Sequence, residues 1–163
     1  MVDLIEEAPR AVWSSGAGRL VFGGSRNNPQ GFAIHPRPGL LLEDGSAHER
    51  VLETHPRWTD DGWIRGEFHL PSLASGGRLI AEYGFFRPMG PPQTNGVLIR
   101  IGCDGVQLAE VAKRYTGRLD TLSVDLSPFS GCSRTLYVEV DADGDSTQDW
   151  LVWTRLAIES RAR

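Results

Sequence analysis

The sequence predicts an all-β protein, an antiparallel jelly-roll β-sandwich, and three observations support this prediction. The chain has 19 glycines and 10 prolines among 163 residues, which exceeds the usual combined share of about 12% and calls for many tight turns. Apolar and polar residues alternate with a period of two in several segments, as in half-buried strands. Turn-forming residues separate these segments. About ten short strands with one apolar face each are best accommodated by two packed sheets.

The alternation is clearest between residues 63 and 70. Ile64, Phe68 and Leu70 share one face, so Trp63 and its alternating neighbours are expected to point outward. The same reasoning predicts that some outward charges pair across neighbouring strands. Further strands are expected at about 11–13, 19–22, 31–34, 50–54, 79–85, 97–103, 106–112, 122–126, 136–140 and 150–158.

Turn signals lie between these segments, and no long helix is expected. Gly and Pro cluster at 75–77, 88–96 and 127–131, and Asp-Gly pairs occur at 104–105 and 143–144. The nearest helix candidate, 108–115, has neither a cap nor a stop signal. It is therefore expected to be a strand followed by a loop.

The length indicates one self-sufficient domain, since 163 residues bury about two thirds of the unfolded surface and leave no room for a second domain. We expect an N-terminal extension at 1–10 and a single sandwich domain at 11–163. Cys103 and Cys132 allow at most one disulfide, at neighbouring strand ends. Reduced thiols are the default where no signal peptide is visible.

Charge and hydropathy exclude several partners. The net charge is −4 and Lys113 is the single lysine among 17 cations, so no basic tract is available for nucleic-acid phosphates. No apolar stretch approaches the roughly 18 residues of a membrane span. The acidic N-terminus is unlike a signal peptide, so a cytoplasmic location is expected if Met1 is the natural start. Localisation and oligomeric state are otherwise left open.

Sequence motifs of catalysis are lacking. The chain has no G-x-S-x-G, H-E-x-x-H or G-x-x-x-x-G-K-[ST] pattern. Ser46, His48 and Glu49 are close in sequence, but a triad is assembled from distant segments, and a polar loop is the preferred interpretation. We therefore predict a protein that is not an enzyme.

An acidic loop near the C-terminus is a candidate cation site. Asp141, Asp143 and Asp145 alternate along the loop, and Asp149 follows. Closely spaced carboxylates are how a loop surrounds Ca²⁺ with oxygen ligands, although the spacing is not that of an EF-hand. The alternative is a solvated hairpin turn in which Asp149 positions Trp150. A structural calcium ion held by the first three carboxylates is the cofactor prediction.

Aromatic residues beside charged ones predict a ligand site. Sugars stack their apolar faces on rings while polar side chains bond their hydroxyls. One group lies along the outward face of 63–70, and another lies in the loops on either side. The predicted ligand-binding residues are Trp58, Trp63, Arg65, His69, Phe86 and Arg87. For each ring, local packing that closes the end of the sandwich is the alternative.

From residue 11 onward, the order of landmarks resembles the NPCBM group of carbohydrate-binding modules in the galactose-binding-like superfamily. The residues that carry the resemblance are Gly84-Phe85, 96–105, Val124 to Ser127 with Gly131, 136–140, Asp149-Trp150 and Trp153. The resemblance implies a galactose-binding-like jelly roll and often a structural calcium ion. It also implies a non-catalytic binding module for a carbohydrate or similar polyhydroxylated ligand. The alternative is a protein-interaction or structural assembly domain, so the expected partner is a glycan or a protein.

Overall fold

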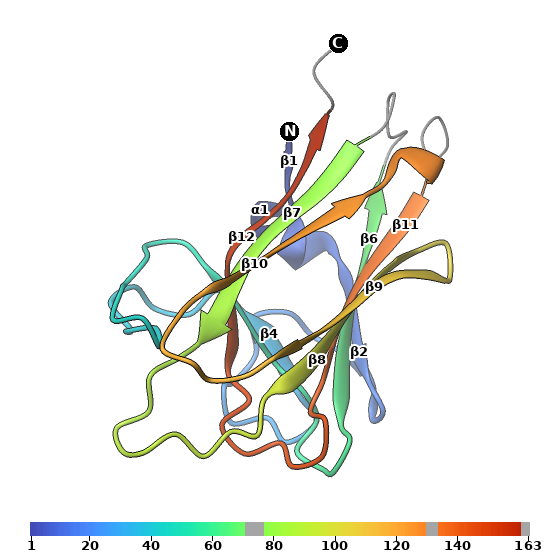
Figure 1. Ribbon diagram of the computed structural model, residues 1–163. Coiled ribbons are helices and arrows are strands. Elements are labelled where there is room, and N and C mark those ends of the chain that lie inside the picture. Colours follow the sequence, from blue (N-terminus) through green and yellow to red (C-terminus); the bar gives the residue numbers. More distant parts are fainter. Residues whose placement is uncertain (71–76, 130–133, 161–163) are drawn as a thin grey trace.

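A computed structural model confirms the antiparallel β-sandwich (Figure 1), and it describes residues 1–70, 77–129 and 134–160. Sheet A has the strand order β10 (Asp120–Asp125), β7 (Gly77–Phe85), β12 (Leu151–Ser160), β5 (Leu52–His55) and β4 (Phe32–Ile34), and β1 (Val2–Asp3) also pairs with β12. Sheet B has the order β3 (Gly18–Leu20), β2 (Val12–Ser15), β6 (Trp63–Leu70), β11 (Arg134–Asp141), β8 (Val97–Cys103) and β9 (Val106–Lys113). The described ranges also contain the short helical segments α1 (Leu4–Glu7), η1 (Ala8–Arg10) and η2 (Ser127–Phe129).

The core lies between the two sheets and follows the predicted alternation. In β6, Ile64, Phe68 and Leu70 are buried, while Trp63 is half-buried and His69 is exposed. Gly66 of the same strand is covered by the Trp13 ring, because a Cβ at this position would lie only 2.6 Å from that ring. The segment 108–115 begins within β9, as predicted, and is not a helix.

The first ten residues are part of the sandwich and do not form the expected extension. β1 pairs with β12 through Val2 and Asp3. Leu4, Ile5 and Ala8 are at most 3% exposed and belong to the main core. The sequence reasoning missed them because this apolar group spans barely one turn, which is too short for either periodicity to be recognised.

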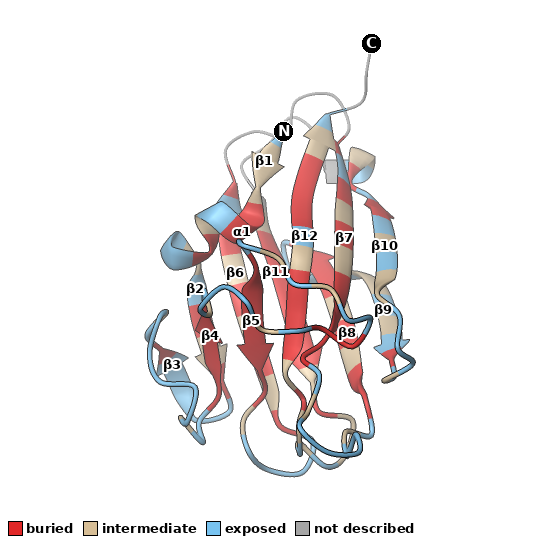
Figure 2. Cartoon of the chain, turned by 90° about the vertical axis from the view of Figure 1, so that its left-hand side faces the viewer, coloured by how far each residue is buried: buried red, intermediate tan, exposed pale blue. Residues whose placement is uncertain are grey.

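The segment 35–51 crosses the outer face of sheet A and covers part of it, over β5 (Figure 2). For this reason every residue of β5 is buried, although a strand of a two-layer sandwich normally exposes one face. Leu42, Val51, Phe86 and Val152 form a second, smaller core under this segment. We call residues 35–51 the crossing segment, and this segment packs over β5.

Two further findings concern the sequence expectations. None of the helices in the described ranges is long and apolar enough to cross a membrane. Cys103 is buried at the end of β8. Cys132 lies outside the described residues, so the disulfide prediction is not tested.

Candidate ligand-binding site

Several of the loops that join the strands lie together at the lower end of the sandwich in Figure 1, away from both termini. There they enclose a depression of about 470 Å³, which we call the loop cleft. Most of its lining residues are of polar types, and two are tryptophans. The lining residues are Arg26, Asn27, His55, Trp58, Gln93, Ser146, Thr147, Gln148 and Trp150.

Trp58 offers an open aromatic face in the loop cleft, with 46% of its surface exposed. Its ring meets the edge of His55 at 5.9 Å between centroids, and His55 stacks on Phe32 at 5.3 Å. The Trp58 amide donates to the carbonyl of Pro29 at 2.9 Å. The indole is therefore held on a preformed support, which lowers the entropy cost of binding a ligand.

His55 is the buried member of this support. Its Nδ1 donates to the Pro56 carbonyl at 2.7 Å. Burial lowers the pKa of His55 to about 4. The imidazole is therefore neutral at physiological pH, and it serves the cleft as a packing group and not as a cation.

The opposite wall of the loop cleft consists of two loops joined by hydrogen bonds. The Gln93 amide donates to Oε1 of Gln148 at 2.8 Å. Thr94 Oγ1 donates to Oδ1 of Asp149 at 2.5 Å. These contacts connect positions 55 residues apart in the chain, and Trp150, another lining residue, directly follows Asp149.

Asp149 is a buried acid directly behind this wall. It is fully buried, and its Oδ2 has no hydrogen-bond partner among the described residues. Burial, reinforced by the nearby Asp145 and Asp143, raises the pKa of Asp149 to about 8. The group is thus mostly protonated and neutral at pH 7.

A second depression of about 300 Å³ adjoins the loop cleft, and we call it the side cleft. The two clefts share Arg26 and Trp150. The remaining lining is mainly apolar and comes from the crossing segment and the loop after β7. These residues are Leu40, Leu41, Phe86, Arg87, Pro88 and Met89.

The side cleft brings together two of the six predicted ligand-binding residues. Phe86 is only 6% exposed and packs in the second core, with the Arg26 guanidinium 5.4 Å from its ring centre. Its ring therefore supports Arg26 and offers little open surface for stacking. Arg87 is exposed, and its Nη2 lies 3.4 Å from the carbonyl of Glu43.

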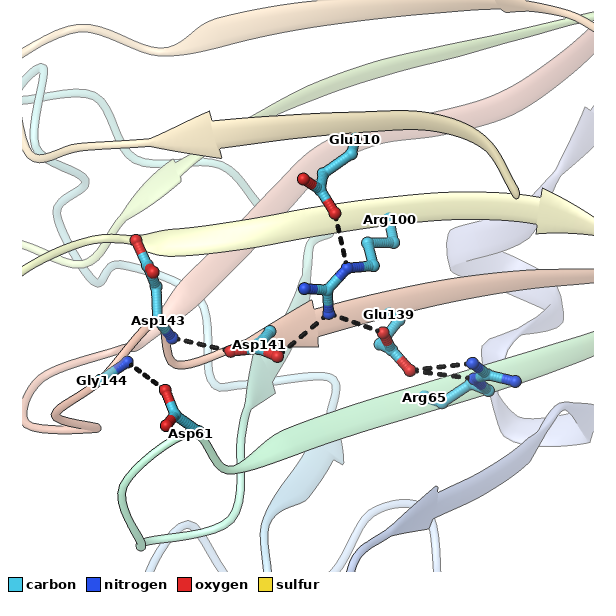
Figure 3. Close-up of polar contacts among 8 residues, drawn as sticks. All are labelled: Asp61, Arg65, Arg100, Glu110, Glu139, Asp141, Asp143 and Gly144. Carbon is cyan, nitrogen blue, oxygen red and sulfur yellow. Dashed lines mark hydrogen bonds and ion pairs between the residues drawn. The ribbon is translucent and has the colours of Figure 1, made fainter.

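Trp63 and Arg65 lie elsewhere, on the outer face of sheet B. Arg65 donates from Nε and Nη2 to Oε1 of Glu139, and its guanidinium stacks on Tyr137 at 4.3 Å. Glu139 also pairs with Arg100, which continues the charge ladder across β11 and β8 (Figure 3). The predicted cross-strand pairing of outward charges is confirmed, since Arg65 and Arg100 on the strands beside β11 both pair with Glu139.

His69 is distant from the other predicted residues. It lies six positions along β6 from Trp63, a separation of roughly 20 Å at the rise of a strand. It lines a separate depression of about 430 Å³ with Glu7 and Arg10. The structure therefore divides the predicted residues among three places. Only Trp58, Phe86 and Arg87 line the loop cleft or the adjoining side cleft, which together we call the joined clefts.

The three predicted calcium ligands do not converge on one point. Asp141 pairs with Arg100 at 3.0 Å, and Asp143 pairs with Arg114 at 3.1 Å. Asp145 is exposed and accepts from the Thr147 amide. Within the described ranges, no group of three His, Cys, Asp or Glu side chains is placed to hold a metal. Calcium binding stays a proposal, which melting curves in calcium and in EDTA test.

Ser46 and His48 lie within hydrogen-bond distance, but the direction of the hydrogen bond does not suit catalysis. Ser46 Oγ lies 2.6 Å from Oδ1 of Asp44 and 3.0 Å from Nε2 of His48. The hydroxyl donates its single proton to the carboxylate, so the imidazole faces it as a donor. A catalytic serine requires the reverse, with the imidazole as the base.

Several cleft residues were not predicted as ligand contacts. Trp150 was recognised only as a landmark, and Arg26, His55, Gln93 and Gln148 were not assigned to a site. Arg26 lies 27 positions from its partner Glu53, and the two loops of the wall are still farther apart. Only Trp150 carried a local signal, as an aromatic residue next to an acid at the start of a strand.

No protein-family model matches the chain, and no curated protein is similar to it in sequence. Several solved carbohydrate-binding modules share its fold. A Clostridium perfringens ZmpB structure containing CBM51-2 in complex with GlcNAc is 17% identical, with a TM-score of 0.60 over 96% of this chain and 31% of that one. TmCBM61 in complex with β-1,4-galactotriose is 12% identical, with a TM-score of 0.58 over 96% and 94%. TmCBM27, described for mannan recognition, is 11% identical, with a TM-score of 0.57 over 99% and 95%.

These likenesses confirm that the chain shares the β-sandwich fold of solved carbohydrate-binding modules. The chain corresponds to nearly the whole of TmCBM61 and TmCBM27, but to less than a third of the ZmpB chain. At these identities the shared architecture says nothing about which side chains contact a ligand. Information about function therefore lies in the clefts and not in the fold.

Proposed function

We propose that the protein is a non-catalytic carbohydrate-binding module whose ligand lies in the loop cleft. The observation that carries the proposal is the exposed Trp58 ring, held by His55 and surrounded by amide and hydroxyl side chains. The similar folds named above, whose descriptions report binding of GlcNAc, galactotriose and mannan, support the class of ligand.

The chemistry of the lining suits a sugar. An indole face provides a flat apolar surface for the C–H face of a pyranose ring. Asn27, Gln93 and Gln148 provide amides that can both donate to and accept from hydroxyl groups. The volume of about 470 Å³ lies within the range of small-molecule sites. The cleft therefore provides stacking and hydrogen bonding together.

The test is glycan-array screening followed by titration calorimetry with the best-binding glycan. Trp58→Ala removes the platform, and we expect a loss of roughly 30-fold or more in affinity, as for a buried aromatic anchor worth about 2 kcal/mol. Trp63→Ala is the matched control, because it removes the half-buried indole on the outer face of sheet B. Circular dichroism checks that both variants fold.

The outcome separates the two predicted aromatic sites. Loss on Trp58→Ala with unchanged binding by Trp63→Ala supports the loop cleft. The opposite result would move the ligand to the outer face of sheet B.

The protein-interaction alternative has its own observation. Met89 is fully exposed at the rim of the side cleft, and Leu41 is 46% exposed beside it. If no glycan binds and sedimentation shows a concentration-dependent oligomer that Met89→Asp abolishes, an assembly role replaces the carbohydrate proposal.

A further inference from the structure

The charged side chains of the joined clefts are all basic. Arg26 lies at the junction, Arg87 lines the side cleft, and the neutral His55 is the remaining ionisable side chain. No carboxylate lines either cleft in the described part of the chain. This is unexpected in a protein of net charge −4, because acids outnumber bases elsewhere.

Arg26 is fixed in place by groups beneath it. Its Nε and Nη2 donate to the two carboxylate oxygens of Glu53 at 2.6 and 2.8 Å, and its plane lies over Phe86. Glu53 is fully buried, whereas the Arg26 side chain is 43% exposed. The Glu53 carboxylate is therefore shielded from solvent, and the Arg26 guanidinium faces the clefts. Nη1 makes no hydrogen bond to any described residue and remains available to a ligand.

The acid directly behind the wall of the loop cleft contributes little negative charge at pH 7. Asp149, directly behind the wall, is buried and mostly neutral at pH 7 because its pKa is raised to about 8. Asp145 and Asp44 are exposed and keep their negative charges, since hydrogen bonds to Thr147 and Ser46 lower the pKa of each, but neither side chain lines a cleft.

We infer that the ligand is an acidic oligosaccharide of at least two sugar units, whose carboxylate or sulfate group binds between Arg26 and Arg87. This inference rests on the proposed function. The loop cleft receives one sugar ring on Trp58, and the chain continues past Trp150 into the side cleft. The anionic group meets the available nitrogen of Arg26 and the exposed guanidinium of Arg87. Arginine suits this role because its planar donor group matches carboxylate and sulfate oxygens.

The experiment compares matched pairs of glycans that differ only in charge. One arm pairs oligogalacturonides with their methyl esters, and another pairs sulfated galactans with their desulfated forms. A third arm pairs sialylated oligosaccharides with desialylated ones. We expect the acidic member of at least one pair to bind at least tenfold tighter, and the binding to weaken as salt is added. The pair that shows the effect identifies the anionic group.

Arg87→Gln provides the variant, because Arg87 is exposed and makes one long contact. We expect it to weaken binding of the acidic glycan about tenfold, as for the loss of one charge-assisted hydrogen bond. Arg19→Gln is the matched control, since Arg19 is exposed on β3 and lines neither cleft. Arg26→Lys is a second variant that keeps the charge but not the paired bonds to Glu53.

The outcomes separate this inference from the proposed function. If neutral and acidic partners bind equally well at the Trp58 platform, the inference is overturned and the proposed function stands. If no glycan of either kind binds, both are overturned. If acidic glycans bind but Arg87→Gln and Arg26→Lys have no more effect than Arg19→Gln, the anionic group lies elsewhere and the assignment to these arginines is wrong.

Discussion

At the scale of single residues, Asp149 is the side chain whose state depends most on its surroundings. A buried carboxylate is costly unless it is paired, and one of its two oxygens has no partner among the described residues. The chain accommodates it by retaining a proton, which raises its pKa from 3.8 to about 8. Protonation therefore links the wall of the loop cleft to pH.

Asp149→Asn is expected to change how stability depends on pH. Between pH 3.8 and about 8, the folded protein holds a proton on Asp149 that the unfolded chain has lost, so stability falls as pH rises through this interval. The neutral asparagine removes this dependence. The pKa of His55 is about 4 in the folded protein and 6.5 in the unfolded chain. Well above pH 6.5 the imidazole is neutral in both states, so His55 does not mask the effect.

Thermal melts of wild type and variant between pH 6.5 and 9 provide the measurement. As the pH rises to about 8, the melting temperature of the wild type should fall relative to that of Asp149→Asn. Above that pH, the difference between the two melting temperatures should remain constant. Parallel curves across the whole range would show that Asp149 is ionised in the folded protein.

At the scale of elements, one buried ion pair joins β9, the end of β7 and the crossing segment. Lys113 and Glu43 are both fully buried, with Nζ 2.9 Å from Oε1. The ammonium also donates to the carbonyls of Arg114 and Arg118, so its three protons have three acceptors. Glu43 in turn accepts from the amides of Phe85, Thr116 and Gly117. The single lysine of an arginine-rich chain therefore stands where three acceptors match the three protons of an ammonium group.

Lys113→Met is expected to destabilise the protein by about 3–5 kcal/mol, because it leaves the Glu43 carboxylate buried without its counter-ion. Urea denaturation measures the change in the free energy of unfolding. Arg155→Gln is the control, since it breaks the exposed pair with Glu159 and should cost less than about 1 kcal/mol. Similar small losses for both variants would show that Glu43 is satisfied by its backbone donors alone.

At the scale of the whole molecule, the sequence predicted the sandwich better than the site. Alternation is local, so strands such as 63–70 could be recognised from a few neighbouring residues. The clefts depend on pairs far apart in the chain, such as Arg26 with Glu53 and Gln93 with Gln148. Trp58 could be recognised as a candidate because an indole in a polar loop is unusual by itself. Arg65 and Phe86 have the composition of ligand residues, but Arg65 is engaged by Glu139 and Phe86 is covered by Arg26.

The final prediction concerns the boundary of the domain, where the expected extension proved to be part of the core. Deletion of residues 1–10 would expose the surface that Leu4 and Ile5 cover, at about 1.5–3 kcal/mol for each side chain. It would also remove the carbonyl of Ala8, which accepts from Trp13 Nε1 at 2.8 Å. The sum approaches the total stability of an ordinary domain, so the truncated protein should melt far below the full chain or fail to fold.

Two point variants make this prediction sharper. Leu4→Ala should cost about 2–5 kcal/mol, as for other cavities in a core. Glu6→Ala, on the exposed side of the same helix, should change stability by less than about 0.5 kcal/mol. If the truncated protein melts at the same temperature as the full chain, α1 contributes nothing to the stability of the sandwich. The domain would then begin at residue 11.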